Sequence, residues 1–191
     1  MTSAADSHDA VTADWAASLL DFWFGQVGEE GWWSHDPSVD RACADRFCGL
    51  WQEMRVRDPG DFLDRGDEAL AAVLLFDQIP RNMFRDRAEA FCTDALAREI
   101  ARGAIARGYD VQIGGAGRLF FYMPFMHSEA MEDQKLSLTL FESAGDAKSL
   151  DFARRHHAMI ERYGRFPHRN AALGRETRPE ERDALTEGAE W

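Results

Sequence analysis

The chain of 191 residues has no apolar run that approaches the ~20 residues a membrane-spanning helix needs. Its start, MTSAADSHDAVTAD, has neither the basic nor the apolar region of a signal peptide. Cysteine is scarce, and Cys43, Cys48 and Cys92 stand in no metal-ligand spacing, which suits a reducing compartment. We therefore expect a cytoplasmic protein in which residues 1–11 form a mobile tail and residues 12–191 a single helical domain.

Sequence motifs for nucleotide binding and hydrolysis are missing as well. There is no G-x-G-x-x-G fingerprint and no P-loop, and GGAG at 114–117 follows no strand, so it is interpreted as a flexible turn. Ser128 lacks the G-x-S-x-G elbow of a hydrolase nucleophile. The chain also has no excess of basic residues, and its formal net charge is −12. This charge argues against nucleic acid and anionic membranes as partners.

Helical periodicity dominates what is present. Hydrophobic residues make up 45% of the chain and aromatic residues 12%, which is ample for a buried core. Apolar residues recur at spacings of three and four, and no segment alternates as a strand would. Helices are predicted over about 12–25, 36–54, 67–80, 88–107, 128–145 and 147–163 and from 177 onward, with YDVQIGGAG as a loop before a short helix RLFFYM. Their short connections predict an all-α fold of antiparallel helix pairs, either a bundle or a right-handed superhelix.

Cap residues set several of these boundaries. Asp36 followed by Pro37 predicts a helix N-terminus, and Gly25, like the glycines after the later helices, is predicted to end its helix in a left-handed conformation. Pro80 is predicted to end the third helix, since proline breaks the hydrogen-bond ladder and disfavours helical geometry in the residue before it. Thr177 and Glu180 fit a capping box that opens the last helix.

Polar residues gather in three stretches: FDQIPRNMFRD at 76–86, FFYMPFMHSEAMEDQ at 120–134 and RHHAMIERYGRFPHRNAALGR at 155–175. Each stretch mixes large apolar residues with charged or amide groups near a helix end, as a concave site with a few convergent polar groups requires. Residues 162–175 carry four arginines and no Asp or Glu, so these charges must find partners elsewhere. We expect the three stretches to meet around one cavity.

The arginines of these stretches have two alternative roles. A guanidinium fork suits two-point contact with a carboxylate or phosphate, which favours an anion site. The alternative is a structural network in which they pair with Asp77, Asp86, Glu89 and Asp94. The arginines concerned are Arg81, Arg85, Arg165, Arg169 and Arg175.

Histidines supply candidate acid–base groups. His127 stands just before Ser128 at a predicted helix start, and it either moves a proton or only donates to a helix-end carbonyl. His157 and His168 fall in the third stretch and are able to meet it in space. Together with Glu129, Asp94 or Asp77 they would form a metal constellation, although the spacing matches no metal motif. Trp32 and Trp33 are interpreted as packing against the second helix, with an aromatic wall or lid as the alternative.

Together with DFWFG and WW upstream, the motifs LLFDQIPRNMFRD, FFYMPFMHSEAMEDQ and RYGRFPHRNAALGR resemble the bacterial family catalogued as domain of unknown function 924. The resemblance runs from about Trp15 to about Leu185. It implies an all-α superhelix similar to tetratricopeptide-repeat proteins, and it implies no particular reaction. The family pattern falls on Asp77, Gln78, Arg81, Asn82 and Arg85, on Tyr122, Pro124, His127, Ser128, Glu129 and Gln134, and on His157, Gly164, Arg165, Phe166, Pro167, His168, Arg169, Asn170, Gly174 and Arg175.

Two functions follow as hypotheses. In the first, a pocket lined by Arg, His and Asn binds or acts on a small anionic metabolite. In the second, a tetratricopeptide-like module clamps the carboxylate of a peptide or protein. A third reading makes the polar motifs a structural core. The catalytic candidates are His127, Glu129 and His168, and the substrate-binding candidates are Asp77, Gln78, Arg81, Asn82, Arg85, Tyr122, Gln134, His157, Arg165, Arg169, Asn170 and Arg175. The sequence indicates no cofactor, no reaction and no oligomeric state.

Overall fold

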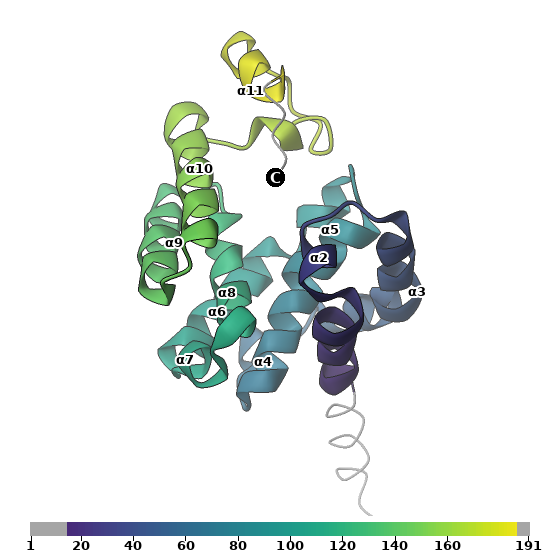
Figure 1. Cartoon of the computed structure of the whole chain (residues 1–191). Coiled ribbons are helices and arrows are strands. Elements are labelled where there is room, and N and C mark those ends of the chain that lie inside the picture. The colour runs from purple at the N-terminus through teal and green to yellow at the C-terminus, as the bar shows by residue number, and fades with distance from the viewer. Residues whose placement is uncertain (1–14, 187–191) are drawn as a thin grey trace, which may run out of the picture.

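The computed structural model describes residues 15–186, and within that range every regular element is a helix (Figure 1). The predicted all-α class is therefore confirmed. The predicted tail over 1–11 and the predicted helix cap at Thr12 lie outside the described residues. In the described part of the chain, no helix combines the length and the apolar character that a membrane span needs.

The elements follow one another with short connections. Residues 15–20 are helical and lead into the π-helical turns η1 (Asp21–Val27). Then come α2 (Gly28–Trp32), α3 (Pro37–Met54), η2 (Pro59–Phe62), α4 (Gly66–Val73), η3 (Leu74–Gln78), α5 (Ile79–Met83), η4 (Ala88–Phe91), α6 (Asp94–Ala106), α7 (Tyr109–Ile113), α8 (Gly115–Met126), α9 (Met131–Ala144), α10 (Ala147–Tyr163), η5 (Pro167–Arg169), η6 (Pro179–Glu181) and α11 (Arg182–Thr186).

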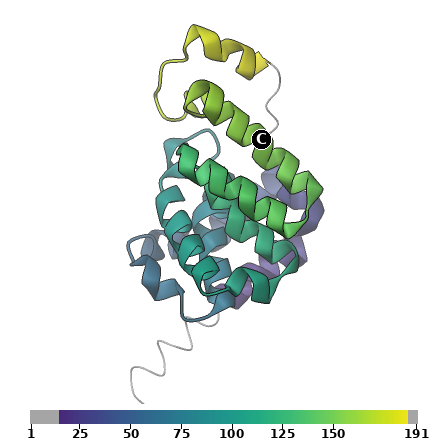
Figure 2. The same ribbon diagram turned by 90° about the vertical axis from the view of Figure 1, so that its left-hand side faces the viewer.

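Neighbouring helices pack side by side around a continuous apolar core. Helices α8, α9 and α10 form one packed series, α4 packs on α6, and α3 packs on α5 (Figures 1 and 2). The buried apolar cluster extends from Trp15 to Ala153. After α10 the chain turns back across the top of the molecule, above α5, before it reaches α11 (Figure 1). The right-handed superhelix of tetratricopeptide type stays a prediction.

Several predicted caps agree with the structure. Asp36 Oδ1 accepts the backbone N–H of Ser38 at 2.7 Å, and Pro37 opens α3. Gly145 and Gly164 end α9 and α10 with φ of 72° and 70°. The prediction for Gly25 is wrong, because π-helical turns carry the helix on to Val27, and the residue with a positive φ is Gly28, at 66°.

The predicted helix end at Pro80 is also wrong, since helical backbone continues through η3 and α5 to Met83. Proline has no N–H to donate to the carbonyl four residues earlier, which here belongs to Phe76. The hydroxyl of Thr93 supplies the missing donor, with its Oγ1 2.7 Å from Phe76 O. A residue 17 positions away thus satisfies the carbonyl that Pro80 leaves open.

Thr93→Val tests this account of the helix around Pro80. The variant keeps the shape of the side chain but leaves Phe76 O and the Trp51 Nε1 donor, which lies 3.3 Å from Thr93 Oγ1, without their partner. We expect the free energy of unfolding to fall by about 2 kcal/mol, the usual cost of stranded buried polar groups. Urea denaturation measures the loss, and Thr93→Ser, which keeps the hydroxyl, should recover most of it. Equal stability of the valine variant would contradict the account.

The segment YDVQIGGAG is not a loop, which corrects the prediction. It forms α7 and the first turn of α8, and Gly114 and Gly115 join them with φ of 63° and 49°. Such positive φ values are accessible to glycine at little cost, so the chain reverses between two helices within a very short connection. No side chain caps the N-terminus of α8.

Three further helix starts differ from prediction. Residues 88–91 form a 3₁₀ turn, so α6 begins only at Asp94, and α9 begins at Met131 instead of Ser128. The hydroxyl of Ser128 still accepts the backbone N–H of Ala130, in the turn before α9. The last helical segment begins at Pro179, where Glu181, not Glu180, accepts the backbone N–H of Arg178.

Candidate functional site

A cluster of polar side chains forms where the three polar stretches meet, above the end of α8 and beneath η5. We call it the polar cluster, and it consists of Asp77, Gln78, Arg81, Asp94, His127, His156 and Arg169. Asp77 and Arg81 come from the helical run around Pro80, His127 from the end of α8 and Arg169 from η5. Arg81 lies 3.3 Å from Asp77 and 2.9 Å from Asp94, and Arg169 lies 3.5 Å from Asp94. Arg81 and Arg169, from the first and the third polar stretch, thus share the carboxylate of Asp94.

His127 and Asp77 form the most chemically suggestive pair of the cluster. His127 Nδ1 lies 2.8 and 3.0 Å from the two carboxylate oxygens of Asp77, which is completely buried. Burial by itself would raise the pKa of Asp77, but the charge of Arg81 and the hydrogen bonds from His127 and Gln78 hold it below its usual range. A charged carboxylate only accepts, so His127 Nδ1 carries the proton and Nε2 keeps its lone pair.

The imidazole of His127 is therefore poised as a neutral base. Burial lowers the pKa of His127, and the raising effect of Asp77 does not outweigh it. Within the described residues, no group forms a hydrogen bond with His127 Nε2. The geometry matches an orienting carboxylate behind a histidine whose second nitrogen is available to a ligand.

Arg81 is fully committed to partners inside the protein. Its guanidinium holds Asp94 through two hydrogen bonds of 2.9 and 3.1 Å and also donates to Ala90 O at 3.1 Å. Burial opposes its charge, but Asp77 and Asp94 outweigh burial and raise the pKa of Arg81 above its usual value. Arg81 therefore neutralises the two buried carboxylates, as the structural reading of the arginines expects.

Arg169 differs from the other arginines because its charge is poorly compensated. Its guanidinium lies between the rings of Phe91 and Phe166, 4.6 Å from each centroid, and only 7% of the side chain is exposed. Its Nε is buried and has no hydrogen-bond partner among the described residues. Burial, reinforced by the nearby Arg81, lowers the pKa of Arg169 to about 10. A buried cation in this state would gain an interaction from an anionic ligand.

His156, not the predicted His157, is the histidine of α10 that reaches the cluster. Its ring centroid lies 6.1 Å from that of His127, and its Nδ1 lies 2.9 Å from Phe152 O. Burial lowers the pKa of His156 to about 3, and His127 adds to the effect. The sequence does hold a signal for it, because the buried residues of α10, Ala153, His156, Ile160 and Tyr163, recur at spacings of three and four.

The other predicted residues of the first two stretches divide between the cluster and distant contacts. Gln78 belongs to the cluster, where its amide donates to Asp77. Asn82 donates to Gln78 O at 3.0 Å, one turn away. Arg85 pairs with Asp40, Tyr122 donates to Asp110, and Gln134 donates to Met126 O and Ser128 O. Arg85, Tyr122 and Gln134 therefore hold helices together away from the cluster.

A second polar network fixes the chain after α10. Glu181 is completely buried and accepts from Arg165 at 2.6 and 2.9 Å and from Asn170 at 3.0 Å. Arg175 donates to both oxygens of Glu129, at 2.7 and 3.0 Å, and Phe166 N donates to Glu129 as well. The structure thus places Glu129, one of the catalytic candidates, as an anchor of this loop, and the carboxylate that contacts His127 is that of Asp77.

His168 stands at the surface over this network. Its residue is exposed and its ring centroid lies 5.5 Å from that of Phe166. Within the described part of the chain, no group of three His, Cys, Asp or Glu side chains is arranged to hold a metal ion.

The fold and the buried cluster define a class: an all-α protein whose helix ends carry a histidine–carboxylate pair beside a sandwiched arginine. The chain belongs to the family described as bacterial protein of unknown function (DUF924), whose model matches residues 19–189. Its structure is similar to that of ATU0120, a protein of unknown function from Agrobacterium tumefaciens, with a TM-score of 0.87 and 41% sequence identity. The match covers 93% of this chain and 99% of that chain. The curated proteins contain no match.

Proposed function

We propose that the protein binds a small anionic molecule at the polar cluster, where Arg169 contacts the anion and His127 Nε2 accepts a proton from it. The observation that carries the proposal is the state of Arg169, a buried cation whose Nε has no partner among the described residues. An oxyanion beside the guanidinium would form charge-assisted hydrogen bonds at a buried position, where such bonds are strong.

Access to the cluster supports a small ligand. The side chains of Arg81 and His127 are 19% and 14% exposed, so the cluster is buried but reaches solvent. The Asp77–His127 pair supplies the proton acceptor that acid–base chemistry on a bound acid needs. The alternative, a module that clamps a peptide carboxylate, needs Arg169 but gives the histidine pair no task.

The test is a titration of isotope-labelled protein with two probes, inorganic phosphate and succinate, followed by NMR. We expect at least one probe to shift the Arg169 Nε and His127 imidazole signals in a saturable way. Arg169→Met should weaken that binding at least tenfold while the melting temperature stays within a few degrees. Arg162→Met removes an exposed positive charge from the same segment and serves as the matched control, with unchanged affinity.

The two probes separate the kinds of anion. A response to phosphate alone assigns a phosphate ligand, and a response to succinate alone assigns a carboxylate. The proposal is overturned if neither probe binds, or if the methionine variant of Arg169 binds as the unchanged protein does. Binding of a peptide with a free C-terminus, but of neither small anion, would support the interaction module instead.

A further inference from the structure

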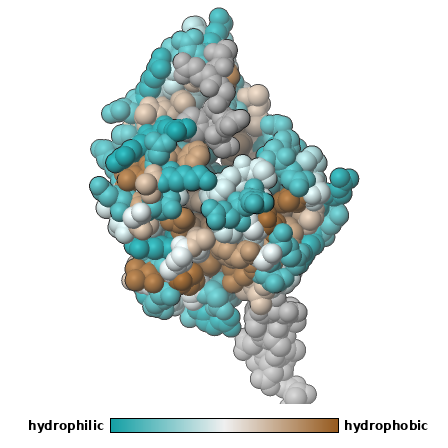
Figure 3. Space-filling view, viewed as in Figure 1, coloured by the Kyte–Doolittle hydropathy of each residue, from teal (hydrophilic) through white to brown (hydrophobic). Residues whose placement is uncertain are grey.

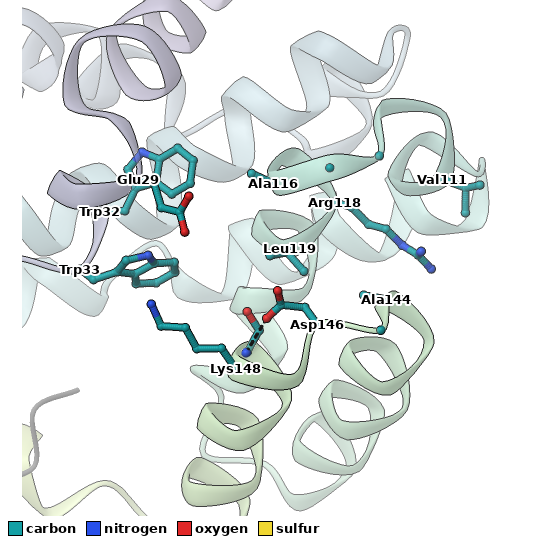
Figure 4. A pocket seen from close by; sticks show the side chains of 14 residues that line it. Glu29, Trp32, Trp33, Val111, Ala116, Arg118, Leu119, Ala144, Asp146 and Lys148 are labelled. Atoms are coloured by element: carbon teal, nitrogen blue, oxygen red, sulfur yellow. Dashed lines mark hydrogen bonds between the residues drawn. The ribbon is translucent and has the colours of Figure 1, made fainter.

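A cleft of about 420 Å³ lies between α2, the turn from α7 to α8, and the start of α10 (Figure 4). It shares no residue with the polar cluster. Its volume falls within the range of roughly 300–1,000 Å³ that small-molecule sites occupy. Val111 of α7 lines it, and Val111 and Ile113 are both exposed. Figure 3 shows a brown patch on the side of the molecule where α7 lies in Figure 1. The cleft is therefore a second candidate site, independent of the proposed function.

The two tryptophans of the WW motif have different roles here. Trp32 is anchored, because its Nε1 donates to Trp23 O at 2.8 Å and its ring packs edge-on against Phe24 and Phe120. Trp33 lines the cleft with 48% of its surface exposed, and its ring lies parallel to Phe120, within 3°. The two ring centroids are 6.4 Å apart, so Trp33 lies beside Phe120 and its open surface offers a stacking platform for a flat ring.

Lys148 brings a positive charge to the same wall. Its ammonium lies 6.0 Å from the centroid of the Trp33 ring, and its side chain extends toward that ring in Figure 4. Lys148 forms no ion pair within the described residues. The nearby carboxylate of Asp146 caps α10 by accepting Ser149 N at 2.6 Å, and its pKa is lowered by that contact and, less, by the charge of Lys148, with which it forms no ion pair. The charge of Lys148 is thus available to a ligand.

The first turn of α8 adds to this positive potential. Gly114, Gly115 and Ala116 line the cleft, and no side chain caps the helix. The backbone N–H groups of an uncapped first turn, together with the helix dipole, favour a negative charge nearby. The motif GGAG is not a nucleotide-binding fingerprint. It places the uncapped N-terminus of α8 in the same cleft as Lys148 and Trp33.

We propose that this cleft binds a planar aromatic molecule with a single negative charge. The ring stacks on Trp33, and the flexible stem of Lys148 lets its ammonium leave the indole face and meet the anion beside the first turn of α8. Glu29, an exposed carboxylate on the same cleft, opposes a more highly charged ligand. The negative charge of Glu29 therefore favours ligands with one negative charge over ligands with two. It also predicts that removing this charge will increase the affinity for an anion.

The experiment uses 2-naphthoate as the probe and the full-length protein, with tryptophan fluorescence and backbone amide NMR as readouts. We expect saturable shifts of the Gly115, Ala116 and Ser149 amides. Trp33→Leu and Lys148→Met should each weaken binding at least fivefold, whereas Glu29→Gln should strengthen it. Lys135→Met, which removes an exposed lysine of α9 outside the cleft, is the matched control and should bind as the unchanged protein does.

Three results would overturn the proposal. One is the absence of shifts at the cleft amides. Another is equal affinity for the neutral analogue 2-naphthalenemethanol, which would leave an apolar cleft without anion selectivity. The third is unchanged affinity in Lys148→Met while its amide spectrum stays that of the folded protein. None of these outcomes bears on Arg169, so the proposal for the cleft and the proposal for the polar cluster are tested independently.

Discussion

Replacing Arg81 by methionine is expected to lower the free energy of unfolding by about 3–5 kcal/mol, the usual cost of stranding buried charges. Arg81 is the shared partner of Asp77 and Asp94, which are 0% and 7% exposed. Without it, Asp77 keeps only His127 and Gln78 among the residues that the structure describes, and Asp94 keeps a distant contact with Arg169.

The same change at Arg169 has the opposite meaning. Burial lowers the pKa of Arg169, so the fold disfavours its charge, and a methionine between Phe91 and Phe166 loses little. We expect the stability of Arg169→Met to stay within about 1 kcal/mol of the unchanged protein, because the variant removes a costly buried charge and Asp94 keeps its two hydrogen bonds with Arg81. The two variants thus distinguish Arg81, which stabilises the fold, from Arg169, which we propose to contact a ligand.

Urea denaturation of both variants at neutral pH measures the difference. Arg81→Lys is the control for charge, and it should recover only part of the stability, since an ammonium cannot match the two-point contact with Asp94. A loss at Arg169 as large as that at Arg81 would make the whole cluster structural. It would remove the observation on which the anion site depends.

The helices were predictable because their signals are local. The apolar spacing and the caps at Asp36, Gly145 and Gly164 depend on residues within a few positions. Pro80 is the instructive failure, since the local rule for proline is sound but Thr93, far along the chain, supplies the hydrogen bond that the rule assumes to be lost. Tertiary contacts of this kind are invisible in a window of sequence.

The sequence predicted which residues of the candidate site lie together better than it predicted what each of them does. The three polar stretches do bring Asp77, Arg81, His127 and Arg169 together. The pairing of Arg81 and Arg169 with Asp94 agrees with the structural alternative for the arginines. The partner of Arg85 was not foreseen, because no local pattern marks Asp40 as the carboxylate that it meets. The cleft at Trp33 was foreseen only as the alternative of an aromatic wall. Its other sides come from glycines and helix starts, which show no apolar periodicity in the sequence.

His156 should make the protein lose stability in acid over an identifiable window. The pKa of His156 is about 3 in the folded protein, against 6.5 when the residue is unperturbed. Below pH 6.5 His156 binds a proton in the unfolded chain, whereas in the folded chain it binds one only near pH 3. Acid therefore favours unfolding. The contribution of neutral His156 to the free energy of unfolding is fully present above pH 6.5. Two pH units below that value, this contribution has fallen by about 3 kcal/mol.

His156→Gln removes this titration and keeps a donor for Phe152 O, which lies 2.9 Å from His156 Nδ1. Between pH 7 and pH 4.5 we expect the variant to lose about 3 kcal/mol less unfolding free energy than the unchanged protein does. His157→Gln, a change at the next residue of α10 and outside the cluster, is the matched control and should follow the unchanged protein. Parallel acid profiles for all three proteins would mean that His156 meets solvent easily. The desolvated interior on which the strength of the anion site depends would then be absent.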